Sequence, residues 1–202
     1  MASHLDELDL ATLPDYAFGA ASPSWWAVFG LMLIEGAAFL LAIGAYLYLM
    51  PFETQWPPAP HPPPGWPVGV ALLVVLLSSE LANVWTKRAG HAMDLARVRA
   101  GLAVMVGAGL LAIGLRAFEF LDLNVHWTDN AYGSIVWAIL VLHTAHLVTD
   151  VYDTVVLLAV SWRKKMTGRK FADVVDNGMY WHFIVWSWVV LFVLLYAVPR
   201  WR

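Results

Sequence analysis

Apolar residues form five long segments separated by short polar stretches. The segments cover about residues 25–50, 67–85, 97–121, 131–162 and 179–199. Each is long enough to cross a hydrocarbon core of roughly 30 Å as a helix, and the fourth is long enough to tilt or project beyond it. Backbone polar groups in lipid have no water to bond with and must hydrogen-bond to one another. The sequence also lacks the alternation of apolar and polar residues that is typical of a membrane barrel. The pattern predicts an all-α membrane protein, a bundle of five transmembrane helices in residues 25–202 behind an acidic N-terminal tail, residues 1–24.

Lys and Arg are concentrated in two of the connections between these segments. One basic connection holds Lys87, Arg88, Arg97 and Arg99. The other holds Arg163, Lys164, Lys165, Arg169 and Lys170. The connections at 51–66 and 122–130 contain neither residue type. Because Lys and Arg favour the cytoplasmic side, we expect a cytoplasmic N-terminus and a C-terminus outside, which is the periplasm in a bacterium.

Composition narrows the class of protein further. Of the 202 residues, 60% are hydrophobic and 12 are Trp, which excludes an ordinary soluble domain. The absence of Cys from the sequence excludes disulfides, thiolate metal sites and iron–sulfur clusters. A net charge of -3 does not indicate a nucleic-acid partner. The acidic N-terminal sequence lacks the basic and apolar regions of a cleavable signal peptide, so we expect none.

The fourth segment carries four ionisable residues at membrane depth, within the stretch VLHTAHLVTDVYDTVVLL. His143, His146, Asp150 and Asp153 follow helical spacing and lie within an arc of roughly 80° on a helix. Charges in lipid are costly, so this face must contact protein or water. Three interpretations are open: a metal site, a proton path, or a hydrogen-bonded seam between helices.

Polar residues occur in the other segments too. Glu35 lies near the middle of the first, where desolvation favours a protonated carboxyl or a pairing with a His of another helix. Arg116 and Glu119 are three positions apart, which predicts an ion pair within one helix. His182 opens the last segment among aromatic residues, as an interfacial anchor or an inter-helix hydrogen-bonding group. The side chains expected to face lipid or an interface are Trp25, Trp26, Tyr180 and Trp181.

The metal interpretation describes an independent membrane metalloenzyme that uses Glu35 and the four residues of the fourth segment. Imidazole and carboxylate groups suit zinc, iron or copper. None of Glu35, Glu80 and Glu119 is followed by His three positions later, as a di-iron bundle requires. A proton-coupled carrier is a further hypothesis, but the sequence shows no internal repeat. We assign no catalytic residue and no metal ligand, and interpret the polar residues as buried groups with a structural or proton-related role.

Four sequence motifs then follow one another in a specific order. They are FGLMLIEGAAFLLAIGAYLYL with Glu35, LRAFEFLD with Glu119, DNAYGSIVWAILVLHTAHL with His143 and His146, and MYWHFIVWSWVVLFVLLY with His182. In this order they resemble subunit III of haem–copper terminal oxidases over nearly all of residues 25–201. Each motif alone is weak, whereas four in order are specific.

The sequence departs from the family pattern in three places. The long family form has seven helices, and this chain begins at the third, as shorter bacterial forms do. The family's lipid sites, in a cleft beside the first two helices, therefore do not carry over whole. Val185 stands where the family has an Asp after YWHF, and Asp150 and Asp153 replace an apolar stretch.

The resemblance implies a non-catalytic accessory subunit in the bacterial inner membrane. Such a subunit packs on the catalytic subunit I, in a complex that includes subunit II, binds phospholipid, and supports proton uptake and stability during aerobic electron transport. The resemblance places haem and copper in partner subunits and no cofactor in this chain. It leaves open whether cytochrome c or quinol supplies the electrons. An accessory protein of a nitric oxide reductase is the alternative.

Overall fold

The computed structural model describes residues 16–163 and 165–201. Five long helices make up most of this described part: α1 (Pro23–Leu49), α2 (Trp66–His91), α3 (Leu95–Leu121), α4 (Ala131–Arg163) and α5 (Gly168–Phe192). After α5 the chain continues through a π-helical turn, Val193–Ala197, into the short α6 (Val198–Trp201). The five spans are long and apolar enough to cross a membrane, which confirms the predicted helical bundle.

Two helices extend well beyond the apolar segments that predicted them. α2 runs on to His91 instead of ending near 85, and α5 begins at Gly168 instead of near 179. Hydropathy detects only the apolar part of a helix, which lies in lipid. Backbone hydrogen bonds continue beyond it, through polar residues at the membrane surface. Residues 1–15 of the predicted tail lie outside the described residues, and α1 begins within the remainder of that tail.

A short turn joins α2 to α3. Met93 adopts a left-handed backbone conformation with a φ of 53°, and Asp94 then caps α3. The Asp94 carboxylate accepts a hydrogen bond from the backbone N–H of Arg97 at 3.1 Å. This cap satisfies one of the free N–H groups at the helix start and allows α3 to return antiparallel to α2.

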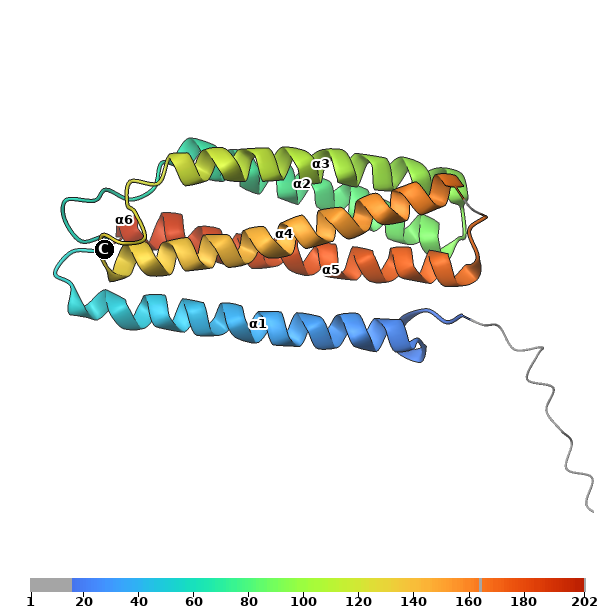
Figure 1. Cartoon of the computed structure of the whole chain (residues 1–202), viewed down its shortest axis with the longest axis horizontal. Coiled ribbons are helices and arrows are strands. Elements are labelled where there is room, and N and C mark those ends of the chain that lie inside the picture. Colours follow the sequence, from blue (N-terminus) through green and yellow to red (C-terminus); the bar gives the residue numbers. More distant parts are fainter. Residues whose placement is uncertain (1–15, 164, 202) are drawn as a thin grey trace, which may run out of the picture.

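α5 is the central helix and α1 is peripheral (Figure 1). Half of the apolar stretch of the last span is buried, compared with 6% for the first span. α1 packs along α4 and α5, while α2 and α3 form a pair on the opposite side of the bundle. Residues on α5 can therefore contact several helices, whereas α1 exposes most of its surface.

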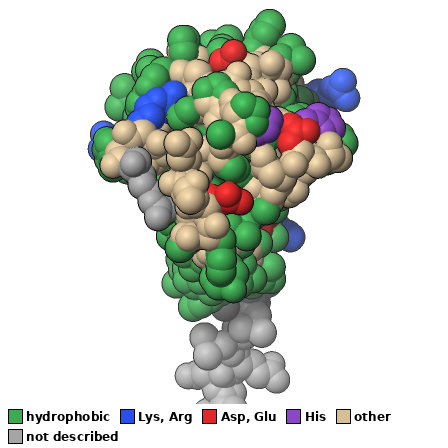
Figure 2. Space-filling view, turned by 90° about the vertical axis from the view of Figure 1, so that its left-hand side faces the viewer, with side chains coloured by type: hydrophobic (Ala, Val, Ile, Leu, Met, Phe, Trp, Pro, Cys, Tyr) green, Lys and Arg blue, Asp and Glu red, His purple; other side chains and the backbone are tan. Residues whose placement is uncertain are grey.

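The basic connections lie at one end of the bundle. The α2–α3 turn and the α4–α5 connection are together at that end, and the long connections after α1 and α3 are at the other (Figure 1). Figure 2 looks onto the latter end, where hydrophobic side chains predominate and acidic and histidine side chains lie next to one another. The fold thus separates the two types of connection as an up-and-down bundle should.

Candidate functional site: polar clusters within the helix bundle

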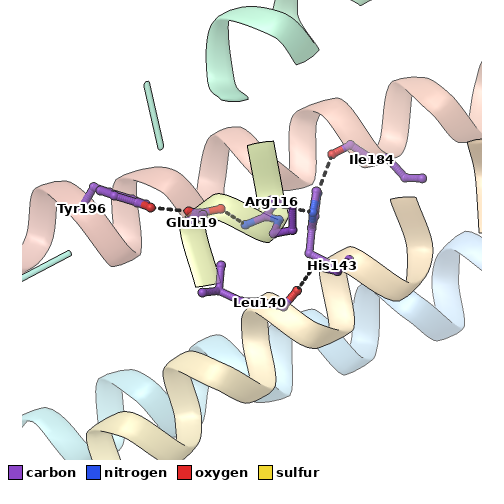
Figure 3. A network of polar contacts seen from close by, with 7 residues as sticks. Arg116, Glu119, Leu140, His143, Ile184 and Tyr196 are labelled. Atoms are coloured by element: carbon purple, nitrogen blue, oxygen red, sulfur yellow. Dashed lines mark hydrogen bonds and ion pairs between the residues drawn. The ribbon is translucent and has the colours of Figure 1, made fainter. Parts of the chain in front are cut away.

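A fully buried ion pair lies on α3 and reaches α4 and α5 (Figure 3). Arg116 Nη1 donates to Glu119 Oε2 at 2.5 Å, and both side chains are almost completely inaccessible. The hydroxyl of Tyr196, in the π-helical turn after α5, donates to the other oxygen of Glu119. The Arg116 guanidinium also lies over the Trp188 ring, 3.9 Å from its centroid. The ion pair predicted within one helix therefore also joins α3 to the last span.

His143 extends this network to α4. Arg116 Nη2 donates to His143 Nδ1 at 3.0 Å, so Nδ1 is the unprotonated nitrogen. Nε2 then carries the proton and donates to the carbonyl of Ile184 at 3.1 Å. Both ring nitrogens of His143 are used within the bundle, so neither is free to bind a metal ion.

A second cluster connects α1 to α4 and α5. Glu35 Oε1 lies 3.3 Å from His146 Nε2, and Tyr180 donates its hydroxyl hydrogen to Glu35 Oε2 at 2.6 Å. Glu35 and His146 each retain only 13% side-chain exposure. The membrane carboxyl is thus satisfied by two helices other than its own, which fixes the position of the peripheral α1.

Replacing Tyr180 with Phe removes one of these two links, and we expect it to weaken the attachment of α1 by about 0.6–2 kcal/mol. Thermal unfolding in detergent, followed by tryptophan fluorescence, measures the loss. Tyr152→Phe on α4 is the matched control because Tyr152 is 71% exposed. A double-mutant cycle with Glu35→Leu, which leaves no acceptor for the Tyr180 hydroxyl, isolates the bond. Additive effects of the two substitutions would refute a direct contribution.

A third cluster contains Asp150 and Asp153, which lie nearer the C-terminal end of α4 than His143 and His146. The Asn177 amide of α5 donates to Asp150 Oδ1 at 3.0 Å and to Asp153 Oδ2 at 3.2 Å. Thr154 lies within hydrogen-bonding distance of the same amide. Asp150 is buried, and its Oδ2 has no hydrogen-bond partner among the described residues.

A cavity of about 600 Å³ opens between α1, α4 and α5 beside this cluster. Its polar lining consists mainly of carboxyl groups, those of Glu35, Asp150, Asp153, Asp173 and Asp176, together with Lys170 and Asn177. Its apolar wall consists of Val28, Leu31, Val156, Leu157 and Val160. The cavity therefore combines an acidic end containing one cation with a hydrocarbon-like side.

His182 belongs to a different contact. Its Nδ1 lies 2.7 Å from Glu80 Oε1 on α2, and Asn83 donates to the other Glu80 oxygen at 3.2 Å. Asn83 also donates to the carbonyl of Gly178 at 2.9 Å. A Cβ on Gly178 would lie 2.6 Å from Asn83 Oδ1, so only glycine permits this close approach of α5 to α2.

The structure brings the predicted polar residues into separate clusters. His143 lies with Arg116 and Glu119, His146 lies with Glu35, and Asp150 and Asp153 lie with Asn177. The described residues contain no group of three or more His, Cys, Asp or Glu side chains placed to hold a metal ion. The metalloenzyme hypothesis therefore has no geometric support in the described part of the chain.

Several partners in these clusters were not identified from the sequence. Asn177, Asn83, Tyr196 and Trp188 are uncharged, so the cost of burying a charge did not single them out. What could have indicated them is spacing: Asn177 lies three and four positions before Tyr180 and Trp181, on one helical face.

The expected lipid or interface residues divide into two groups. Trp26 is exposed and donates its indole N–H to the Ala20 carbonyl at 2.9 Å, and Trp25 stacks on Phe29. Trp181, by contrast, is 1% exposed and donates to Ser79 Oγ at 2.9 Å, so the prediction that it faces lipid or an interface is wrong. Tyr180 is likewise buried. Both lie on the sides of the central helix that neighbouring helices cover.

Together these observations define a multi-pass helical membrane protein whose intramembrane polar groups chiefly join its own helices. The sequence matches the protein family described as Cytochrome c oxidase subunit III over residues 25–200. This match covers well over half of the chain, and the chain therefore belongs to that family.

Individual relatives show the same similarity. The cytochrome c oxidase subunit 3 of Synechocystis sp. is 24% identical over 199 residues, which cover 95% of this chain and 84% of the relative. That of Thermostichus vulcanus is 26% identical, with 86% and 88% of the two chains covered. That of Branchiostoma lanceolatum is 30% identical over 145 residues, which cover 70% of this chain and 54% of the relative.

Proposed function

We propose that the chain is the non-catalytic accessory subunit III of a haem–copper respiratory oxidase. It packs on the catalytic subunit I in a complex that also contains subunit II. The observation that carries the proposal is the family match across residues 25–200. The basic connections at one end of the bundle support a cytoplasmic N-terminus and an outer C-terminus in a bacterial inner membrane.

Haem and copper belong to the partner subunits in this proposal. The histidines of the spans do not fit as their ligands. Both nitrogens of His143 are engaged, and His146 and His182 lie in separate contacts with Glu35 and Glu80, so the described residues gather no set of ligands. Polar side chains that hydrogen-bond with one another between helices are suited to holding the subunit in one arrangement. The oxidase chemistry then takes place outside this chain.

Phospholipid binding and support of proton uptake are further parts of the proposal. The cavity between α1, α4 and α5 has an apolar wall for an acyl chain, and its basic side chain, Lys170, is paired with Asp173 at 2.9 Å. Its carboxyl groups, with the unpartnered Oδ2 of Asp150, suit an ammonium headgroup or water molecules that exchange protons. These features support lipid occupancy near the end of the bundle that carries the basic connections.

Purification of the native complex through a tag on this chain tests the proposal. We expect haem and copper to co-purify, as read by the optical spectrum and metal analysis, and to be absent from the chain isolated alone. Haem with non-haem iron and no copper would indicate a nitric oxide reductase instead. Tightly bound metal in the isolated, chelator-washed chain would refute an accessory role.

A further inference from the structure

The Glu80–His182 pair lies inside the membrane and yet faces outward. The His182 side chain is 54% exposed, whereas Glu80 is 14% exposed. Glu80 lies five residues from Trp85 and seven from Lys87 along α2, which places it roughly 7 and 10 Å inside those surface markers. An ionisable group open to hydrocarbon at this depth is costly and marks a contact with something other than lipid.

The pair leaves hydrogen-bonding atoms directed away from the bundle. Both oxygens of Glu80 are used, one by His182 and one by Asn83. His182 uses Nδ1 for Glu80, and its Nε2 makes no hydrogen bond within the described residues. Trp186, one turn further along α5, is 50% exposed, and its indole N–H likewise has no partner there. The two rings lie 5.9 Å apart.

Apolar side chains surround these two polar atoms. The exposed residues form a stripe along α5, the start of the π-helical turn and the adjoining side of α2, made up of Leu77, Val84, His182, Trp186, Val190 and Val193. We call this stripe the α2/α5 face. The outer side of α3 offers a contrast, since its exposed large residues include Val104, Leu110, Leu111 and Phe118. The α2/α5 face therefore differs from the outer side of α3 by the outward polar groups of His182 and Trp186.

We propose that the α2/α5 face is the docking surface for a transmembrane helix of another subunit, and that this helix presents a hydroxyl or amide side chain to His182 and Trp186. A hydroxyl or amide both donates and accepts, so it satisfies His182 Nε2 in either protonation state and accepts from the Trp186 indole. The rest of the partner helix packs against apolar side chains, as helices do in membranes. This proposal rests on the proposed function, because it assumes that the chain belongs to a larger membrane complex.

Site-specific photo-crosslinking in native membranes tests the face directly. Benzoylphenylalanine in place of Trp186 should crosslink to one other protein, identified by mass spectrometry. The same probe in place of Leu110 on α3, which is 57% exposed, is the matched control and should give no protein adduct. No adduct at 186, equal adducts at both positions, or an adduct to a second copy of this chain would each overturn the proposal.

Substitution of His182 tests the polar contact independently of the probe. His182→Leu should weaken partner retention about 3- to 30-fold, the factor that one inter-helix hydrogen bond provides in a membrane. His182→Gln, which keeps a donor and an acceptor, should retain the partner. Retention equal to the unchanged chain for both variants would refute the contact. If His182→Leu fails to fold, the crosslinking result still decides.

The two proposals fail in different ways. If the tagged chain brings haem and copper but position 186 gives no protein adduct, the oxidase function stands and the α2/α5 face is wrong. If position 186 crosslinks to a membrane protein but the complex holds neither haem nor copper, the docking face stands and the oxidase function is wrong.

Discussion

Replacing Arg116 with leucine should destabilise the folded chain by about 3–5 kcal/mol, the range measured when one partner of a buried ion pair is removed. The substitution leaves Glu119 as an uncompensated buried carboxylate and removes the hydrogen bond to His143. Helical circular dichroism against temperature in detergent, together with the yield of assembled complex, measures the effect. We expect little properly assembled protein.

Two variants make this result interpretable. Arg97→Leu removes an exposed ion pair with Asp94, on the same helix, and should cost about 0–1 kcal/mol. The double variant Arg116→Leu with Glu119→Leu removes both charges and should be more stable than Arg116→Leu alone, since no buried charge remains unpaired. A double variant less stable than the single one would contradict this explanation and assign the loss to packing.

Replacing Gly109 with leucine should cost about 1–3 kcal/mol or more by overpacking the contact of α3 with α4 and α5. A Cβ at this position would lie 2.4 Å from Val151 Cγ2 and 3.1 Å from Trp181 Cη2. Val151 is β-branched and has one preferred rotamer in a helix, so it cannot simply turn away. The midpoint of thermal unfolding in detergent should fall accordingly.

Gly107 provides a matched control two positions earlier in α3. A Cβ there meets no atom within 4 Å, and the position is exposed. Gly107→Leu should therefore leave stability unchanged or raise it slightly, because glycine is a poor residue in a helix interior. Equal losses for the two variants would show that hydrophobic bulk on α3, rather than the contact at Gly109, is responsible.

The fold followed from the sequence because the bilayer restricts a spanning chain to very few solutions. Apolar length set the number of spans, and the periodicity of polar residues placed His143 and Asp150 on one face. Hydropathy could not show where α2 ends or where α5 begins, because Arg88 and Lys170 lie in helical turns beyond the apolar core. A change of solvent at the membrane surface does not interrupt backbone hydrogen bonding.

The candidate site was less predictable. The sequence identified the costly residues but not their partners. It suggested that Glu35 pairs with a His of another helix, and the structure shows that this residue is His146, with Tyr180 completing the contact. It also treated the face of the fourth segment as one seam, whereas the structure divides it among Arg116, Glu35 and Asn177. Contacts between helices far apart in sequence leave little trace in local spacing.

By itself the sequence determined the helical membrane class, the separation of basic connections from those that lack Lys and Arg, and the order of motifs that identifies the family. These properties depend on local composition and length, and on the cost of leaving backbone groups unpaired in lipid. Only the tertiary structure decided that both ring nitrogens of His143 are hydrogen-bonded within the bundle. It also decided that Trp181 is buried and that His182 faces outward beside Glu80. The reason is physical: pairing within a bundle depends on which helix faces meet, and that is set by close packing across the whole molecule.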